Sequence, residues 1–124
     1  MRKALSQFVL VLLGSIITGF VIGTVQHYVA FGVWEGGFDV ENFKLALFEG
    51  GILGAVFGVP TGIVTFYLLL RRSLNLKRAS FIVLGSLICG VGSAVAIFWI
   101  SAFVAPFATL GVALLARKIE WRPD

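Results

Sequence analysis

The sequence predicts an all-α protein that crosses a membrane with four helices. Of its 124 residues, 59% are hydrophobic and only 13% are charged, and the mean hydropathy is +1.02. A soluble domain of this size could not bury that much apolar surface, so a lipid bilayer is the expected solvent. Because the hydrocarbon layer is about 30 Å thick, each spanning helix needs about 20 apolar residues. The lengths of the charge-free stretches therefore indicate how many helices cross.

Three charge-free stretches predict four spans within a single transmembrane domain, residues 1–124. The stretches are 4–31, 50–70 and 79–116. As one helix, the third would be about 57 Å long at 1.5 Å per residue, so it must fold back on itself. We place a tight turn near 100–103, between Trp99 and Pro106. The predicted helices are 4–30, 46–70, 79–99 and a short fourth helix at 103–118.

The first predicted helix begins after Arg2 and Lys3, as a signal peptide would. Its apolar run is longer than the usual core of about 7–15 residues, and no small-x-small cleavage site follows. We therefore interpret this segment as a transmembrane helix that is retained.

Glycine recurs at every fourth position of the second predicted helix, the spacing of a glycine zipper. These glycines leave a groove in which another backbone can settle. The first helix carries a similar strip of small residues, and so does the third. The three sets are Gly50, Gly54, Gly58 and Gly62; Ser15, Gly19 and Gly23; and Ser86 and Gly90. We interpret them as surfaces for helix packing, within one chain or between chains, and a pore or ligand groove is the alternative.

Pro60 lies in the middle of the second predicted helix, where it removes a backbone donor and clashes with the carbonyl of Val56. We expect a kink there, with Thr61 and Thr65 satisfying the carbonyl that is released. The alternative is a polar site of the kind that broken helices form in transporters.

Two ionisable residues near the outward-facing surface of the membrane are candidate functional groups. Glu49 is predicted at the start of the second helix, where it favours the helix dipole and meets headgroup water, and proton coupling is the alternative. His27 is predicted to face water at the end of the first helix, and a ligand contact is the alternative. One histidine cannot supply both axial ligands of a haem, and the lone Cys89 rules out a multi-cysteine metal site within one chain. No catalytic residue, cofactor or metal is predicted.

The distribution of charge predicts the orientation. All Lys and Arg residues except Lys44 flank helix ends on one side, which the positive-inside rule makes cytoplasmic. Both termini are therefore predicted inside. The other side carries Glu35, Asp39 and Glu41. A basic rim beside anionic lipid accounts for the net charge of +4 without a nucleic-acid partner.

The four predicted helices form two hairpins that resemble each other. Residues 13–19 (LGSIITG) are similar to 84–90 (LGSLICG), and Pro60 and Pro106 each precede a pair of basic residues by the same distance. Two parallel copies of one hairpin would give this pattern. A chance match between glycine-rich apolar sequences would give it too, and both explanations stay open.

The sequence favours a non-catalytic role in the cytoplasmic (inner) membrane of a bacterium. We expect a small accessory subunit that docks with other membrane-protein subunits, or a scaffold that forms a homo-oligomer, because small-residue surfaces are present and no chemical constellation is found. The alternative is a small oligomeric transporter or channel for an ion or small solute. Its path would be lined by the kink at Pro60, Thr61 and Thr65, with Glu49 and His27 at its outer mouth.

The predicted orientation can be tested with reporter fusions. A reporter placed after Asp124 or within 74–77 should report the cytoplasm, and a tag within 35–39 should be accessible from outside the cell, because the basic residues stay inside. Protease protection of the tag measures the second point. Equal populations of both orientations would contradict the assignment.

Overall fold

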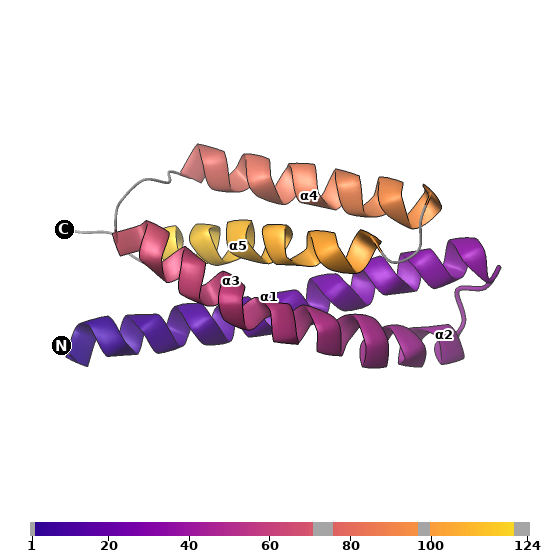
Figure 1. The fold of residues 1–124 in the computed structure, drawn as a ribbon, viewed down its shortest axis with the longest axis horizontal. Helices are drawn as coiled ribbons and strands as arrows, with labels where there is room; N and C mark the ends of the chain where they lie inside the picture. Colours follow the sequence, from indigo (N-terminus) through magenta and orange to yellow (C-terminus); the bar gives the residue numbers. More distant parts are fainter. Residues whose placement is uncertain (1, 71–75, 97–99, 121–124) are drawn as a thin grey trace.

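The computed structural model describes residues 2–70, 76–96 and 100–120, and within them every residue outside 35–39 is helical. The elements are α1 (Arg2–Trp34), α2 (Val40–Leu45), the π-helical segment η1 (Ala46–Gly51), α3 (Ile52–Leu70), α4 (Leu76–Ala96) and α5 (Ile100–Glu120). Because α2, η1 and α3 follow one another without a break, they make one continuous rod (Figure 1). The prediction of an all-α protein with four long helical rods is confirmed for the described residues.

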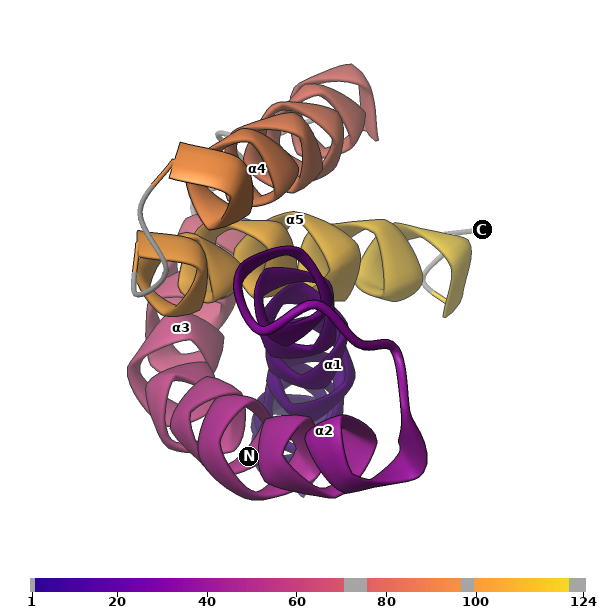
Figure 2. The same cartoon turned by 90° about the vertical axis from the view of Figure 1, so that its right-hand side faces the viewer.

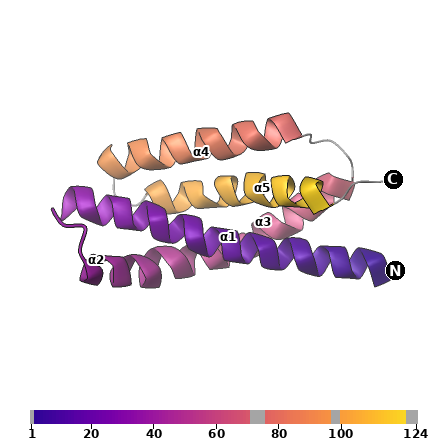
Figure 3. The same ribbon diagram turned by 180° about the vertical axis from the view of Figure 1, so that it is seen from behind.

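The rods lie side by side along the length of the molecule, with α5 in the central position. α5 contacts α1, α3 and α4, whereas α4 packs mainly on α5 and less on α1. Seen end-on, α4 lies at the periphery of the bundle (Figure 2). α1 begins and α5 ends at the same end of the bundle, which is clear from both sides (Figures 1 and 3).

The connection between the first two rods is shorter than the sequence suggested. α1 continues to Trp34, and helical structure resumes at Val40 instead of near residue 46. Asp39 is the N-cap of α2, because its side chain accepts a hydrogen bond of 2.8 Å from the backbone N–H of Asn42. Asn42 in turn donates from Nδ2 to the carbonyl of Gly37 at 2.7 Å. These two bonds close the 35–39 segment into a compact turn.

The turn predicted near 100–103 is wrong in position. α5 begins at Ile100, so residues 100–103 are helical, and the chain reverses between Ala96 and Ile100, outside the described residues. α5 is also not short, since it has 21 residues. Pro106 misled the prediction because it lies inside α5 and not in the first turn, where a proline fits a helix most easily.

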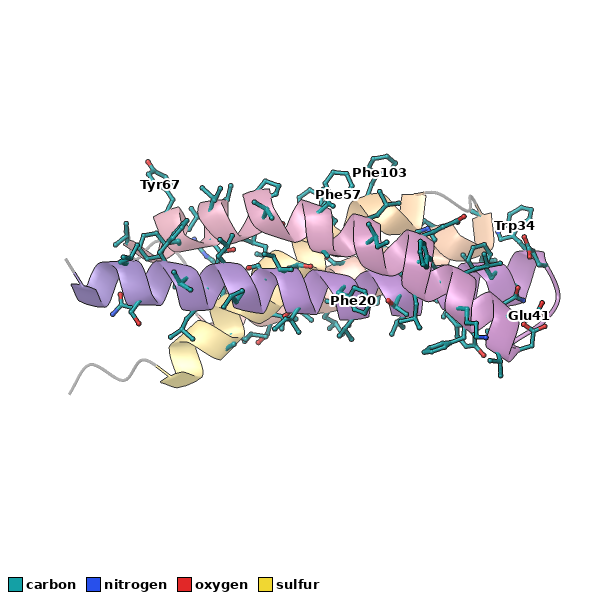
Figure 4. All side chains as sticks on the ribbon, turned by 90° about the horizontal axis from the view of Figure 1, so that it is seen from below. Phe20, Trp34, Glu41, Phe57, Tyr67 and Phe103 are labelled. Atoms are coloured by element: carbon teal, nitrogen blue, oxygen red, sulfur yellow. The ribbon has the colours of Figure 1, made fainter. Side chains whose placement is uncertain are left out.

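The interior holds mainly small and polar side chains, and most of the large apolar ones point outward, although Phe31 and Leu114 are buried. The largest fully buried side chains are Thr65, Thr109 and Ser15. By contrast, Phe81 is 78% exposed and Phe48 is 73% exposed. Figure 4 shows large side chains projecting from the bundle along its whole length. This is the reverse of the distribution in a soluble domain, where large apolar residues fill the core.

Two helical segments of the described chain are long and apolar enough to cross a membrane, namely Leu5–Trp34 and Val40–Leu70. A shorter apolar helix covers Phe103–Ala116. The first two correspond to the first two spans predicted from the sequence.

Candidate functional site

The contact between α1 and α3 is made by backbone rather than by side chains. All four glycines of the Gly50, Gly54, Gly58 and Gly62 series are buried, and each faces α1. A β-carbon added to Gly54 would overlap the carbonyl oxygen of Gly19, and one added to Gly19 would overlap that of Gly54. The two helices therefore approach as closely as their backbones allow, which is the packing that small residues permit in membranes.

The same relation holds along the whole contact. Gly23 and Gly50 face each other as Gly19 and Gly54 do, and a β-carbon on either would overlap the other's carbonyl oxygen. Towards the N-terminal end of α1, a β-carbon on Gly58 would lie 2.7 Å from the carbonyl oxygen of Ser15. Backbone carbonyls and Cα–H groups at this range form weak hydrogen bonds that add to the van der Waals attraction. The strip on α1 thus meets the strip on α3.

The π-helical segment keeps the glycines of the second rod facing α1. Residues four apart in an α-helix advance by about 40° around the axis, so a strict four-residue repeat drifts away from its partner. The wider turn of η1 winds less per residue and reduces that drift. As a result both Gly50 and Gly51 are buried, and a β-carbon on Gly51 would lie 2.7 Å from the ring of Phe20 and 2.8 Å from Oγ1 of Thr24.

A third helix meets this contact at its middle. A β-carbon on Gly19 would lie 3.4 Å from Oγ1 of Thr109, which is fully buried on α5. The hydroxyl of Thr109 donates to the carbonyl of Ala105 at 2.8 Å, so it adds no unpaired polar group to the interior. α1, α3 and α5 are therefore joined at one level of the bundle.

The small residues of α4 have a different neighbour. Ser86 and Gly90 are both buried, and a β-carbon on Gly90 would overlap Nε2 of Gln26 on α1. Gly19, the counterpart of Gly90 in the internal similarity, instead faces α3 of its own hairpin. The two matched glycines do not make equivalent contacts.

The residues around Pro60 do not converge on one path. Pro60 is exposed, whereas Thr61 and Thr65 are buried. The hydroxyl of Thr61 donates to the carbonyl of Phe57, and that of Thr65 donates to the carbonyl of Thr61 at 2.6 Å. Neither hydroxyl bonds the carbonyl of Val56, which is the one released by the proline. The expectation that the two threonines satisfy this carbonyl is therefore wrong. Each hydroxyl bonds four residues back, as Thr commonly does in helices.

His27 is buried, with 4% of its surface exposed, so the prediction that it faces water is wrong. Its ring lies over Gly50, where a β-carbon would be 2.6 Å from Cβ and Cγ of His27. It also makes an edge-to-face contact with Phe31, with ring centroids 6.0 Å apart. The glycine spacing that brings α1 and α3 together also creates the space that this ring fills.

Glu49 lies inside η1 rather than at a helix start, because the rod already begins at Val40. The capping position that the sequence suggested for it belongs to Asp39. Glu49 is exposed, and it lies beside Gly50, over which His27 is seated.

Gln26 continues the small-residue strip of α1, since its position seven residues after Gly19 puts it on nearly the same face, and it is buried there. The outward face of α4 was not predicted from the sequence. Nothing lies within 4 Å of a β-carbon added to Gly85 or Gly92, and Cys89 between them is exposed. Helical spacing places these three residues on one face.

Comparison with protein-family models, curated proteins and solved structures finds no match for this chain. Among the described residues, no group of three or more His, Cys, Asp or Glu side chains is placed to hold a metal ion. The candidate site is therefore a set of helix-packing surfaces, and its chemistry is that of close backbone contact.

The glycine contact between α1 and α3 can be tested with one added methyl group. Gly54→Ala should destabilise the protein by about 1–3 kcal/mol, because the methyl overlaps the backbone of α1. Gly85→Ala is the matched control, since the same methyl meets open space there and alanine favours the helix in both variants. Thermal unfolding in lipid nanodiscs measures both. Equal melting temperatures for the two variants would show that the contact does not hold the bundle together.

Proposed function

We propose that this chain is a four-span protein of a bacterial cytoplasmic membrane that acts without catalysis, by docking with other membrane helices as a small subunit or a self-associating scaffold. In this proposal four rods each cross the bilayer. They are α1, α4, α5 and the continuous rod made of α2, η1 and α3. α4 and α5 have 21 residues each, which gives about 32 Å of helix, close to the thickness of the hydrocarbon layer.

The side-chain distribution supports a lipid environment for the whole bundle. Exposed Leu, Ile, Val and Phe residues occur on every long rod, which in water would make a surface prone to aggregation. Lipid tails are as apolar as these side chains, so their exposure costs nothing in a bilayer. Trp34 and Tyr67 project at opposite ends of the bundle (Figure 4). These are the positions at which aromatic residues meet the two membrane surfaces.

The orientation proposed is with both termini in the cytoplasm. α1 begins and α5 ends at the same end of the bundle, as four spans require. The 35–39 turn, with Glu35 and Asp39, lies at the opposite end. The positive-inside rule assigns that acidic end to the outside.

The observation that carries the docking proposal is the open face of α4, which consists of Gly85, Cys89 and Gly92. Elsewhere in the chain, closely spaced glycines are filled by a neighbouring backbone, as between α1 and α3. On α4 the same residue type faces outward with no atom within 4 Å, and α4 is the peripheral helix. Large side chains cover most of the remaining outward surface, where Gly14 on α1 is a single open glycine, so a strip of three small residues favours contact with another helix.

The docking proposal predicts that bulk on this face blocks association without unfolding the chain. Gly92→Leu should weaken association by about tenfold or more, because the new side chain keeps the partner backbone away. Gly14→Leu is the matched control, since Gly14 on α1 also has open space around it. Association is measured by co-purification in mild detergent and by counting subunits in nanodiscs, alongside the melting temperature of each variant.

Two results would contradict the docking proposal. One is recovery of the wild-type chain solely as an isolated monomer with no stable partner. The other is equal association of the Gly92→Leu and Gly14→Leu variants. Oxidation with copper phenanthroline separates the two forms of the proposal, because a symmetric contact between two copies brings their Cys89 thiols together, whereas contact with another subunit does not.

A further inference from the structure

Gln26 presents a buried polar group that the bundle does not satisfy. It is 3% exposed, and within the described part of the chain neither Oε1 nor Nε2 has a hydrogen-bond partner. Its side chain lies against the backbone of α4 at Gly90, where a β-carbon would be 2.9 Å from Cδ and 3.5 Å from Cγ of Gln26. The carboxamide is therefore aimed at the small-residue strip of α4, which includes Ser86 and Gly90.

A buried carboxamide in this position requires a hydrogen-bond partner. Removing an amide from water without a new hydrogen bond is costly, and in a bilayer no solvent can compensate. Thr24, Thr61, Thr65 and Thr109 avoid this cost by bonding carbonyls of their own helices. The side chain of Gln26 makes no such bond, and no other group among the described residues pairs with it, which favours a partner from outside the chain.

We propose that Gln26, together with Ser86 and Gly90, forms a binding site for water between α1 and α4. A carboxamide is neutral, donates through Nε2 and accepts through Oε1, so it suits a small neutral molecule that does both. Such a molecule bridges the amide to carbonyls of neighbouring helices, as buried waters commonly do. Among the described residues no charged side chain accompanies Gln26 on the strip, which favours a neutral ligand over an ion.

The site fills when α4 withdraws from α1. In the closed arrangement the carboxamide is already in contact with Gly90, and both of its polar atoms are sealed. α4 is the rod best placed to move, because it is peripheral and touches α1 less than it touches α5 (Figure 2). Gln26 precedes the end of α1 at Trp34 by about 12 Å, counted at 1.5 Å per residue, so water reaches it from the outer surface by a short route.

This inference rests on the membrane placement in the proposed function, but it does not depend on docking. The water site uses the face of α4 that carries Ser86 and Gly90, whereas docking uses the face that carries Gly85, Cys89 and Gly92. Either can fail while the other stands.

The test measures water contact at the side chain of Gln26 in the full wild-type chain. The sequence contains two glutamines, Gln7 and Gln26, so selective 15N-glutamine labelling gives two side-chain amide signals. Gln7, near the inner end of α1 and partly exposed, is the internal control for contact with bulk water. The variant Gln26→Met assigns the signals, because it removes one of them while keeping the size of the side chain.

In water-edited solid-state NMR spectra of the chain in lipid bilayers, the Gln26 side-chain signal should build up within about tenfold of the rate for Gln7. In a second sample labelled with 15N-glycine, the backbone amide of Gly19, at the centre of the glycine contact, gives the rate for a sealed position. A Gln26 signal that builds up no faster than this amide would overturn the proposal.

Discussion

The approach of α1 and α3 at backbone distance is the constraint on which the rest of the bundle depends. Glycine on both sides removes the β-carbons that would otherwise separate the helices, so carbonyl groups of one rod pack on Cα groups of the other. The space left beside Gly50 receives the ring of His27, and the level of Gly19 receives Thr109 of α5. α4 packs mainly on α5, so the position of α5 determines where α4 lies. A change at this contact is therefore transmitted to every other rod.

Close backbone contact also explains the composition of the two surfaces. When helices meet through glycine, there is no room between them for large side chains, and the fully buried positions go to Ser15, Thr65 and Thr109. The hydroxyls of both threonines bond carbonyls of their own helices and so cost little inside. Most of the large apolar side chains are left for the outside, a distribution that suits contact with lipid tails, which are equally apolar. In water the same distribution would expose most of the apolar surface of the chain.

Charge-free length and glycine spacing predicted the helical rods and singled out the residues that meet between α1 and α3. Features set by contacts between rods were not predictable. An isolated sequence does not show that His27 lies over Gly50 or that Gln26 lies against Gly90, because each burial depends on which helix is the neighbour. The cap at Asp39 lies outside the charge-free stretch from which the second helix was predicted, so that criterion could not find it. The position of the α4–α5 reversal left no polar signal in an apolar segment.

The distance between the α1 and α3 backbones tests this account most directly. Glycine Hα atoms on facing helices give cross peaks in NMR spectra only when they are within about 5 Å, and only close backbone packing brings them there. In nanodiscs containing glycine-labelled protein, we expect Hα–Hα cross peaks between Gly19 and Gly54 and between Gly23 and Gly50. Absence of both, in a sample whose helices are otherwise intact, would contradict the claim that this contact organises the bundle.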